Sequence, residues 1–193
     1  MEQLQQGDAL IVVDVQNDFL PGGALGISGG DRIVPILTAY IARFQARGLP
    51  IFVTRDWHPP NHCSFLPQGG PWPPHCVAGS SGSLPPANFQ PPPSAVLIYK
   101  AVDPDKDAYS TLEHTPLDRH LRALKIQRLF IGGLATDYCV LNTVRDARRL
   151  GYDVCLLVDG IEAVNLHPDD GRRAEAEMLR LGAVPVRLES VAA

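Results

Sequence analysis

Cys139 is the residue of this sequence whose position most directly suggests chemistry. It follows an apolar run at 129–132 and begins a segment, 139–150, whose apolar residues recur at helical spacing. A thiol in the first turn of a helix feels the positive end of the helix dipole, which favours the nucleophilic thiolate. The alternative is that Cys139 is only a small buried apolar residue. Whether it is reactive therefore depends on the polar groups that the fold places beside it.

The turn before Cys139 contains residues suited to a binding site. Gly132 and Gly133 are expected to end the preceding strand and to let the backbone approach a ligand closely. Thr136 or Asp137 is expected to cap the helix that follows. The helix N-terminus then offers backbone N–H groups for a developing oxyanion.

Two further ionisable residues, Asp14 and Lys100, each follow a predicted strand. The carboxyl ends of the strands meet at one edge of an open α/β sheet, where such folds bind ligands. An aspartate beside a lysine keeps its charge, and the lysine also favours the thiolate form of Cys139. The three residues together are suited to acyl transfer by a thiol, with the carboxylate passing the proton to the leaving group. A buried structural ion pair between Asp14 and Lys100 is the alternative.

A second group of residues could bind a metal ion. Asp56 and His58 follow another predicted strand, and His75 lies further along the same loop. One carboxylate and two imidazoles suit a divalent metal, with zinc first and iron or manganese as further candidates. His62 is a fourth candidate ligand. Surface histidines without a metal are the alternative, whereas a thiolate zinc site is disfavoured because the chain contains no CxxC pair.

Strand and helix patterns alternate along the chain, which predicts an α/β fold. The expected architecture is one domain, residues 1–193, with three α/β/α layers and a central, mainly parallel sheet of Rossmann-like topology. The predicted strands are residues 9–13, 50–54, 95–99, 129–132, 154–158 and 184–187, and the predicted helices are residues 31–48, 117–124, 139–150 and 169–181.

The long segment at about 59–94 has no helical or strand period and is rich in proline, glycine and serine. A loop of this length in a compact domain usually has a function. Residues 59–77 are expected to line the site, and residues 78–94 are expected to form a surface excursion.

Composition excludes several functional classes. The chain has 193 residues, of which 45% are hydrophobic and 20% charged, with a formal net charge of -4, so a nucleic-acid surface is not expected. No apolar run approaches the roughly 18 residues that span a bilayer. Four cysteines and no recognisable export signal favour a reducing cytoplasm over a disulfide-bonded secreted protein.

Several motifs, taken together and in order, resemble those of a known family. They are DVQNDF at 14–19, TRDWHP at 54–59, GPWPPHC at 70–76, Lys100, and GLATDYCV at 133–140. The chain resembles the nicotinamidases of the isochorismatase-like cysteine hydrolase superfamily over nearly its whole length. The aspartate, lysine and cysteine mark the superfamily, while DWHP together with WPPHC points to the nicotinamidases.

This resemblance implies a role for each matching residue. It implies that Cys139 is the nucleophile, Asp14 the general base and then acid, and Lys100 the group that fixes and tunes both. The implied metal ligands are Asp56, His58 and His75, with His62 outside the core set; the implied substrate-binding residues are Phe19, Trp72 and Tyr109. It further implies a cis bond between Leu134 and Ala135, and an oxyanion site formed by the backbone N–H groups of Ala135 and Cys139.

The activity that the resemblance implies is a step of NAD salvage. Nicotinamide would be hydrolysed to nicotinate and ammonia through a thioester on Cys139, with the pyridine nitrogen held by one divalent metal ion, Zn²⁺ or alternatively Fe²⁺ or Mn²⁺. The partner is then a small molecule rather than a nucleic acid or a membrane, and a homo-oligomer is left open. The alternatives are an amidase for pyrazinamide, biuret or a ureido acid, and a non-enzymatic zinc-binding protein. The segment 80–93 matches no catalytic motif.

Overall fold

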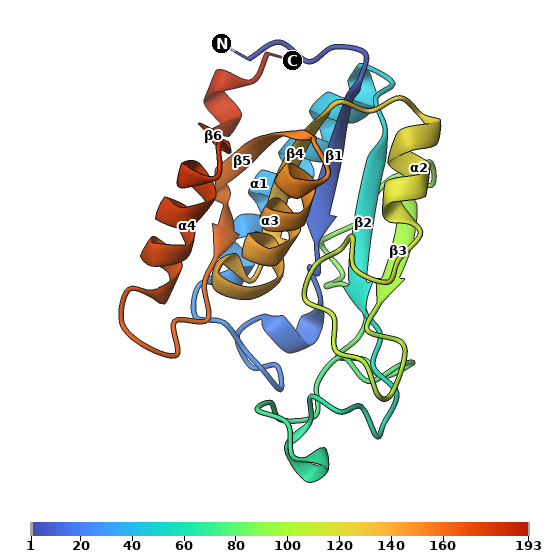
Figure 1. The fold of residues 1–193 in the computed structure, drawn as a ribbon, viewed down its shortest axis with the longest axis vertical. Helices are drawn as coiled ribbons and strands as arrows, with labels where there is room; N and C mark the ends of the chain where they lie inside the picture. Colours follow the sequence, from blue (N-terminus) through green and yellow to red (C-terminus); the bar gives the residue numbers. More distant parts are fainter. Residues whose placement is uncertain (1, 193) are drawn as a thin grey trace.

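A computed structural model describes residues 2–192 of the chain. Its centre is a six-stranded sheet in the order β3-β2-β1-β4-β5-β6, and every neighbouring pair of strands is parallel (Figure 1). The strands are β1 Asp8–Val13, β2 Ile51–Asp56, β3 Val96–Lys100, β4 Arg128–Leu134, β5 Asp153–Glu162 and β6 Val184–Val186. The predicted parallel α/β sheet is confirmed.

Helices cover both faces of this sheet. They are α1 Ile33–Ala46, α2 Leu117–Ala123, α3 Leu141–Arg149 and α4 Asp170–Arg180. Helix α1 packs on one face through side chains such as Leu37 and Phe44. Helices α2, α3 and α4 pack on the other face, where Leu121, Val144 and Met178 join a second hydrophobic cluster. The three-layer prediction is therefore confirmed (Figure 1).

Strand β1 lies in the middle of the sheet and is buried along its whole length. Its side chains alternate between the two clusters, with Leu10 and Val12 on the α1 side and Ile11 and Val13 on the other. A parallel strand covered on both faces reads as an uninterrupted apolar run, as this one does. The chain order reverses between β1 and β4, which places a binding crevice at their carboxyl ends.

The glycines of β4 do not end the strand, so this prediction was wrong. Strand β4 continues through both to Leu134, with a register shift against β5 between Ile131 and Gly133. Gly133 has a φ of 130°, and a Cβ there would collide with the backbone of Val13. The close approach that requires glycine is thus to strand β1 rather than to a ligand.

The turn after β4 also differs from the prediction. Thr136–Val140 forms a wide π-type turn that continues directly into α3, and no side chain caps it. Asp137 instead accepts hydrogen bonds from the backbone N–H groups of Val164 and Asn165, at 2.9 and 2.8 Å. Its carboxylate therefore joins the Thr136–Val140 turn to the loop between β5 and α4.

The segment between β2 and β3 is irregular apart from a short 3-10 turn, Leu66–Gln68. Its second part is not a simple surface excursion, because Phe89 and Ser83 are almost completely buried. The backbone N–H groups of Asn17 and Asp18 donate to the carbonyls of residues 84 and 82. The segment thus packs against the chain that follows β1.

None of the helices in residues 2–192 combines the length and the apolar character that a membrane span requires.

Candidate active site

The strand ends bring the predicted catalytic residues together around one ammonium group. The Nζ atom of Lys100 lies 3.0 Å from Asp14 Oδ2, 2.5 Å from Asp56 Oδ1 and 3.4 Å from Cys139 Sγ, and it donates to the carbonyl of Ala108. Lys100 reaches Asp56 because the two residues are paired across β2 and β3. The Lys100 side chain is fully buried, so all these contacts are shielded from water.

Asp14 occupies the first position after β1 with a φ of 48°, in the left-handed region that L residues other than Asn and Asp adopt infrequently. The hydroxyl of Thr54 donates to its Oδ1 at 2.6 Å, while Oδ2 faces Lys100. Burial raises the pKa of Asp14 to about 6, although Lys100 and Thr54 oppose the shift. Asp14 is therefore a carboxylate at neutral pH that can accept and return a proton.

The thiol of Cys139 is buried between this group and α3. Burial raises its pKa well above the ordinary value, and the nearby Lys100 only partly offsets the rise. The effect of burial therefore outweighs the stabilisation of the thiolate that was expected from the lysine. Cys139 therefore needs a neighbouring base in order to react, and Asp14 is the carboxylate placed to serve.

The charges of Lys100 and Asp56 are well defined. Burial alone would lower the pKa of Lys100, but Asp14 and Asp56 hold it well above the ordinary value. Burial would likewise raise the pKa of Asp56, but Lys100 and His58 hold it below its usual range. Lys100 therefore stays positively charged at neutral pH. It lies between Asp56, which stays negatively charged, and Asp14, whose pKa is about 6.

The predicted metal ligands also converge. Asp56, His58 and His75 each offer a ligand atom, and these atoms lie within 4.8 Å of one another. Each imidazole faces a carbonyl oxygen through Nδ1, His58 that of Ala101 at 3.3 Å and His75 that of Pro73 at 2.7 Å. A carbonyl only accepts, so Nδ1 carries the proton and Nε2 keeps its lone pair. Among the residues that the structure describes, the buried His58 Nε2 has no hydrogen-bond partner, as expected of an atom that binds a metal.

His62 does not join this group of ligand atoms. Its ring lies 4.3 Å from the ring of His58, measured between centroids. Its Nδ1 is 2.7 Å from Ser64 Oγ and its Nε2 is 3.2 Å from the carbonyl oxygen of Lys106. Both ring nitrogens are thus engaged elsewhere, and His62 packs behind His58.

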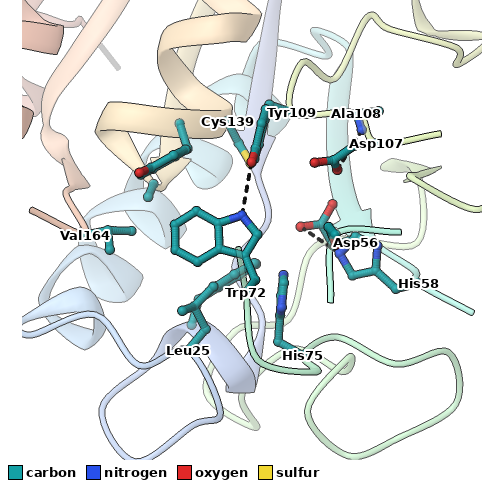
Figure 2. A pocket seen from close by; sticks show the side chains of 14 residues that line it. Leu25, Asp56, His58, Trp72, His75, Asp107, Ala108, Tyr109, Cys139 and Val164 are labelled. Carbon is teal, nitrogen blue, oxygen red and sulfur yellow. Dashed lines mark hydrogen bonds and ion pairs between the residues drawn. The ribbon is translucent and has the colours of Figure 1, made fainter. Parts of the chain in front are cut away.

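Cys139 and the three candidate metal ligands line the same pocket, which contains about 410 Å³ of empty space (Figure 2). The predicted substrate-binding residues all line it, and the indole nitrogen of Trp72 donates to the hydroxyl of Tyr109 at 3.0 Å. Ala135 lines it together with Cys139, and the Leu134–Ala135 peptide bond is cis. The lining residues are Phe19, Leu25, Asp56, His58, Ser64, Trp72, His75, Asp107, Ala108, Tyr109, Ala135, Tyr138, Cys139 and Val164.

Some lining residues were not predicted. Tyr138 packs its ring edge-on against Trp72 with centroids 5.0 Å apart, and its place beside Cys139 in the sequence could have indicated it. Leu25, Val164 and Asp107 come from loops that carry no motif. The result is a pocket with aromatic walls, a thiol at one side and a carboxylate-histidine group at another (Figure 2).

Comparison with known proteins gives a consistent result. The family described as "Isochorismatase domain" matches residues 8–190. The chain is 41% identical over 197 residues to the nicotinamidase of Escherichia coli (strain K12), an alignment that covers 91% of this chain and 92% of the relative.

Two solved structures have the same fold. The pyrazinamidase of Pyrococcus horikoshii in complex with zinc superposes with a TM-score of 0.90 at 46% identity, covering 94% of this chain and 99% of that chain. PnC1 from L. infantum in complex with nicotinate also superposes with a TM-score of 0.90, at 36% identity, covering 97% of this chain and 96% of that chain.

Proposed function

The chain belongs to the isochorismatase family, and from that premise we propose that it is a nicotinamidase, which hydrolyses nicotinamide to nicotinate and ammonia. The observation that carries the proposal is that a single pocket contains both Cys139 and the group Asp56, His58 and His75. The E. coli relative is a nicotinamidase, and the L. infantum structure holds nicotinate. We further propose that the whole chain, residues 1–193, forms one domain that works in the cytoplasm.

The nitrogen and oxygen donors of Asp56, His58 and His75 fit one divalent metal ion, which we propose to be zinc, with iron or manganese as alternatives. The related Pyrococcus protein was solved with zinc. When bound, this metal would offer an open coordination position to the pyridine nitrogen of the substrate. Phe19, Trp72 and Tyr109 would hold the ring from the sides, with the carboxamide directed toward Cys139.

The chemistry begins at the thiol. Asp14 accepts the Sγ proton of Cys139 while the sulfur attacks the carboxamide carbon, because the thiol pKa is too high for a free thiolate. Lys100 keeps Asp14 and the sulfur in place and balances the charge that develops between them. The backbone N–H groups of Ala135 and Cys139 stabilise the oxyanion.

The second part of the reaction returns the enzyme to its starting state. Protonated Asp14 gives its proton to the amide nitrogen, the C–N bond breaks, ammonia leaves, and a thioester remains on Cys139. Asp14, again a carboxylate, then takes a proton from water as the water oxygen attacks the thioester carbon. The C–S bond breaks, the proton on Asp14 returns to the sulfur, and the acid product leaves as nicotinate after losing its own proton to solvent.

A substrate comparison tests the proposal. The purified zinc-loaded protein is incubated with nicotinamide, pyrazinamide and a ureido acid, and ammonia and the acid products are measured. We expect turnover of nicotinamide, and of pyrazinamide because its ring nitrogens can meet the same metal position. Turnover confined to the ureido acid, which has no ring for the aromatic walls, would favour another amidase of the family. No turnover of any amide would contradict the proposal.

A further inference from the structure

Gln16 is a fully buried glutamine beside the site, and two of the three hydrogen bonds of its carboxamide go to one residue. Its Nε2 donates to the backbone carbonyl of Asp56 at 2.8 Å, and its Oε1 accepts from the backbone N–H of Asp56 at 2.8 Å. The second hydrogen of Nε2 goes to the carbonyl of Ser83 at 3.0 Å. The side chain thus pairs with Asp56 as a second peptide group would.

The sheet explains why Asp56 needs such a partner. Strands β1 and β2 pair only as far as Val12 and Val53, whereas β2 continues for three more residues to Asp56. Strand β3 satisfies the other side of β2, pairing Lys100 with Asp56. On the β1 side the chain has already turned away, and the Gln16 carboxamide takes the place of the missing strand. Buried backbone groups left unpaired there would destabilise the end of the strand.

The position of Asp56 matters more than that of an ordinary strand residue, because its carboxylate belongs to both groups of the site. Its Oδ1 lies 2.5 Å from Lys100 Nζ, and its Oδ2 lies 3.6 Å from His58 Nε2. A small shift of this backbone would move the carboxylate away from one neighbour or the other.

We propose that Gln16 is a positioning residue that fixes the Asp56 backbone, so that one carboxylate serves the metal site and the catalytic lysine at once. The inference rests on the metal site of the proposed function. It does not depend on which amide is the substrate.

A different role for Gln16 would be to anchor the irregular segment through Ser83 alone. The neighbouring Asn17 provides the matched control, because its Nδ2 donates to the carbonyl of Ser81 in the same segment at 2.9 Å. None of the hydrogen bonds found for the Asn17 side chain in residues 2–192 reaches Asp56. Asn17→Leu therefore loosens the segment without touching the carboxylate.

The test measures zinc affinity by competition with a chelator for the wild type, Gln16→Met, Gln16→Asn and Asn17→Leu. Gln16→Met keeps the length and loses the hydrogen bonds, while Gln16→Asn keeps the amide but is too short to reach. Changes behind metal ligands typically weaken metal binding by about 10–100-fold, and we expect that loss in both Gln16 variants. Asn17→Leu should stay within about threefold of the wild type. Far-UV circular dichroism confirms that each variant is folded, and Gln16→Asn decides the matter if Gln16→Met does not fold.

A second readout is independent of zinc loading. The alkylation rate of Cys139 in metal-free protein depends on the contact between Asp56 and Lys100. We expect this rate to change in the Gln16 variants and to stay the same in Asn17→Leu.

Wild-type zinc affinity in a folded Gln16 variant, or an equal loss of zinc affinity in Asn17→Leu, would overturn the inference while leaving nicotinamide hydrolysis intact. A wild type that bound zinc without hydrolysing nicotinamide would overturn the proposed function only. A wild type that bound no divalent metal would overturn both.

Discussion

The two halves of the site are built by different means. Asp14, Lys100 and the turn to Cys139 project from the carboxyl ends of three parallel strands, so the sheet brings Lys100 Nζ to 3.0 Å from Asp14 Oδ2 and 3.4 Å from Cys139 Sγ. His58 and His75 lie on an irregular segment, held by backbone hydrogen bonds between residues 58, 76 and 78 and by carbonyls behind each ring. Asp56, the last residue of β2, belongs to both halves.

This difference predicts a division of labour. In the proposed mechanism the strand-borne half makes and breaks bonds, so a substitution there should act mainly on kcat. In the same mechanism the loop-borne half holds the ring through the metal, so a substitution there should act mainly on KM and on metal affinity.

The largest effect is expected from Cys139→Ala. Removing the nucleophile should lower kcat by at least about 10⁴-fold, because no other group can form the thioester. Nicotinamide binding, measured by calorimetry, should persist because the aromatic walls and metal ligands remain. Cys63→Ala is the matched control, since Cys63 is a free cysteine outside the pocket lining. Substantial hydrolysis by Cys139→Ala would contradict the division of labour between the two halves of the site.

His58→Ala, or removal of the metal by a chelator, should have the next largest effect. Loss of a ligand should weaken zinc binding beyond the roughly 10–100-fold seen for changes behind ligands, and KM for nicotinamide should rise more than kcat falls. Steady-state kinetics together with metal analysis measure both quantities. Full activity in a metal-free preparation would remove the metal from the account.

The pH dependence should report the strand-borne half. Asp14 must be a carboxylate to act as base, and burial raises its pKa to about 6. We therefore expect kcat/KM to fall about tenfold per pH unit below pH 6 and to be level just above pH 7, because the pKa of Lys100 lies well higher. Rates measured with constant zinc loading give the profile. Activity that was unchanged down to pH 4.5 would show that Asp14 is not the base.

Thr54→Val should produce the smallest effect. Its hydroxyl donates to Asp14 Oδ1, and this hydrogen bond lowers the pKa of Asp14. Without it the acid limb of the profile should move to higher pH, while kcat on the plateau changes by less than about tenfold. Thr38→Val, on the exposed side of α1, removes a hydroxyl remote from the pocket and should leave the profile unchanged.

The sequence predicted the strand-borne half well, because apolar runs locate strands and parallel strands share one edge. Asp14, Lys100 and Cys139 could therefore be placed together from the positions of strand ends. The metal group could be proposed from its donor residues, but the choice of His75 over His62 rested on the family resemblance, since proline-rich loops have no period from which to infer contacts.

Three features lay beyond sequence reasoning for identifiable reasons. Asp137 is in a good capping position, yet its carboxylate bonds to a distant loop instead. The close contact of Gly133 with Val13 depends on strand register. The role of Gln16 depends on β2 extending beyond the last residue pair that it forms with β1, which no local sequence pattern reveals.

Trapping the thioester tests the central claim most directly. The zinc-loaded protein is mixed with nicotinamide, quenched in acid during turnover, digested and analysed by mass spectrometry. The account predicts a nicotinoyl group on the peptide that contains Cys139, sensitive to hydroxylamine and absent from Cys139→Ala. Turnover at the normal rate with no acyl group on Cys139, even when quenched within a single turnover, would contradict it.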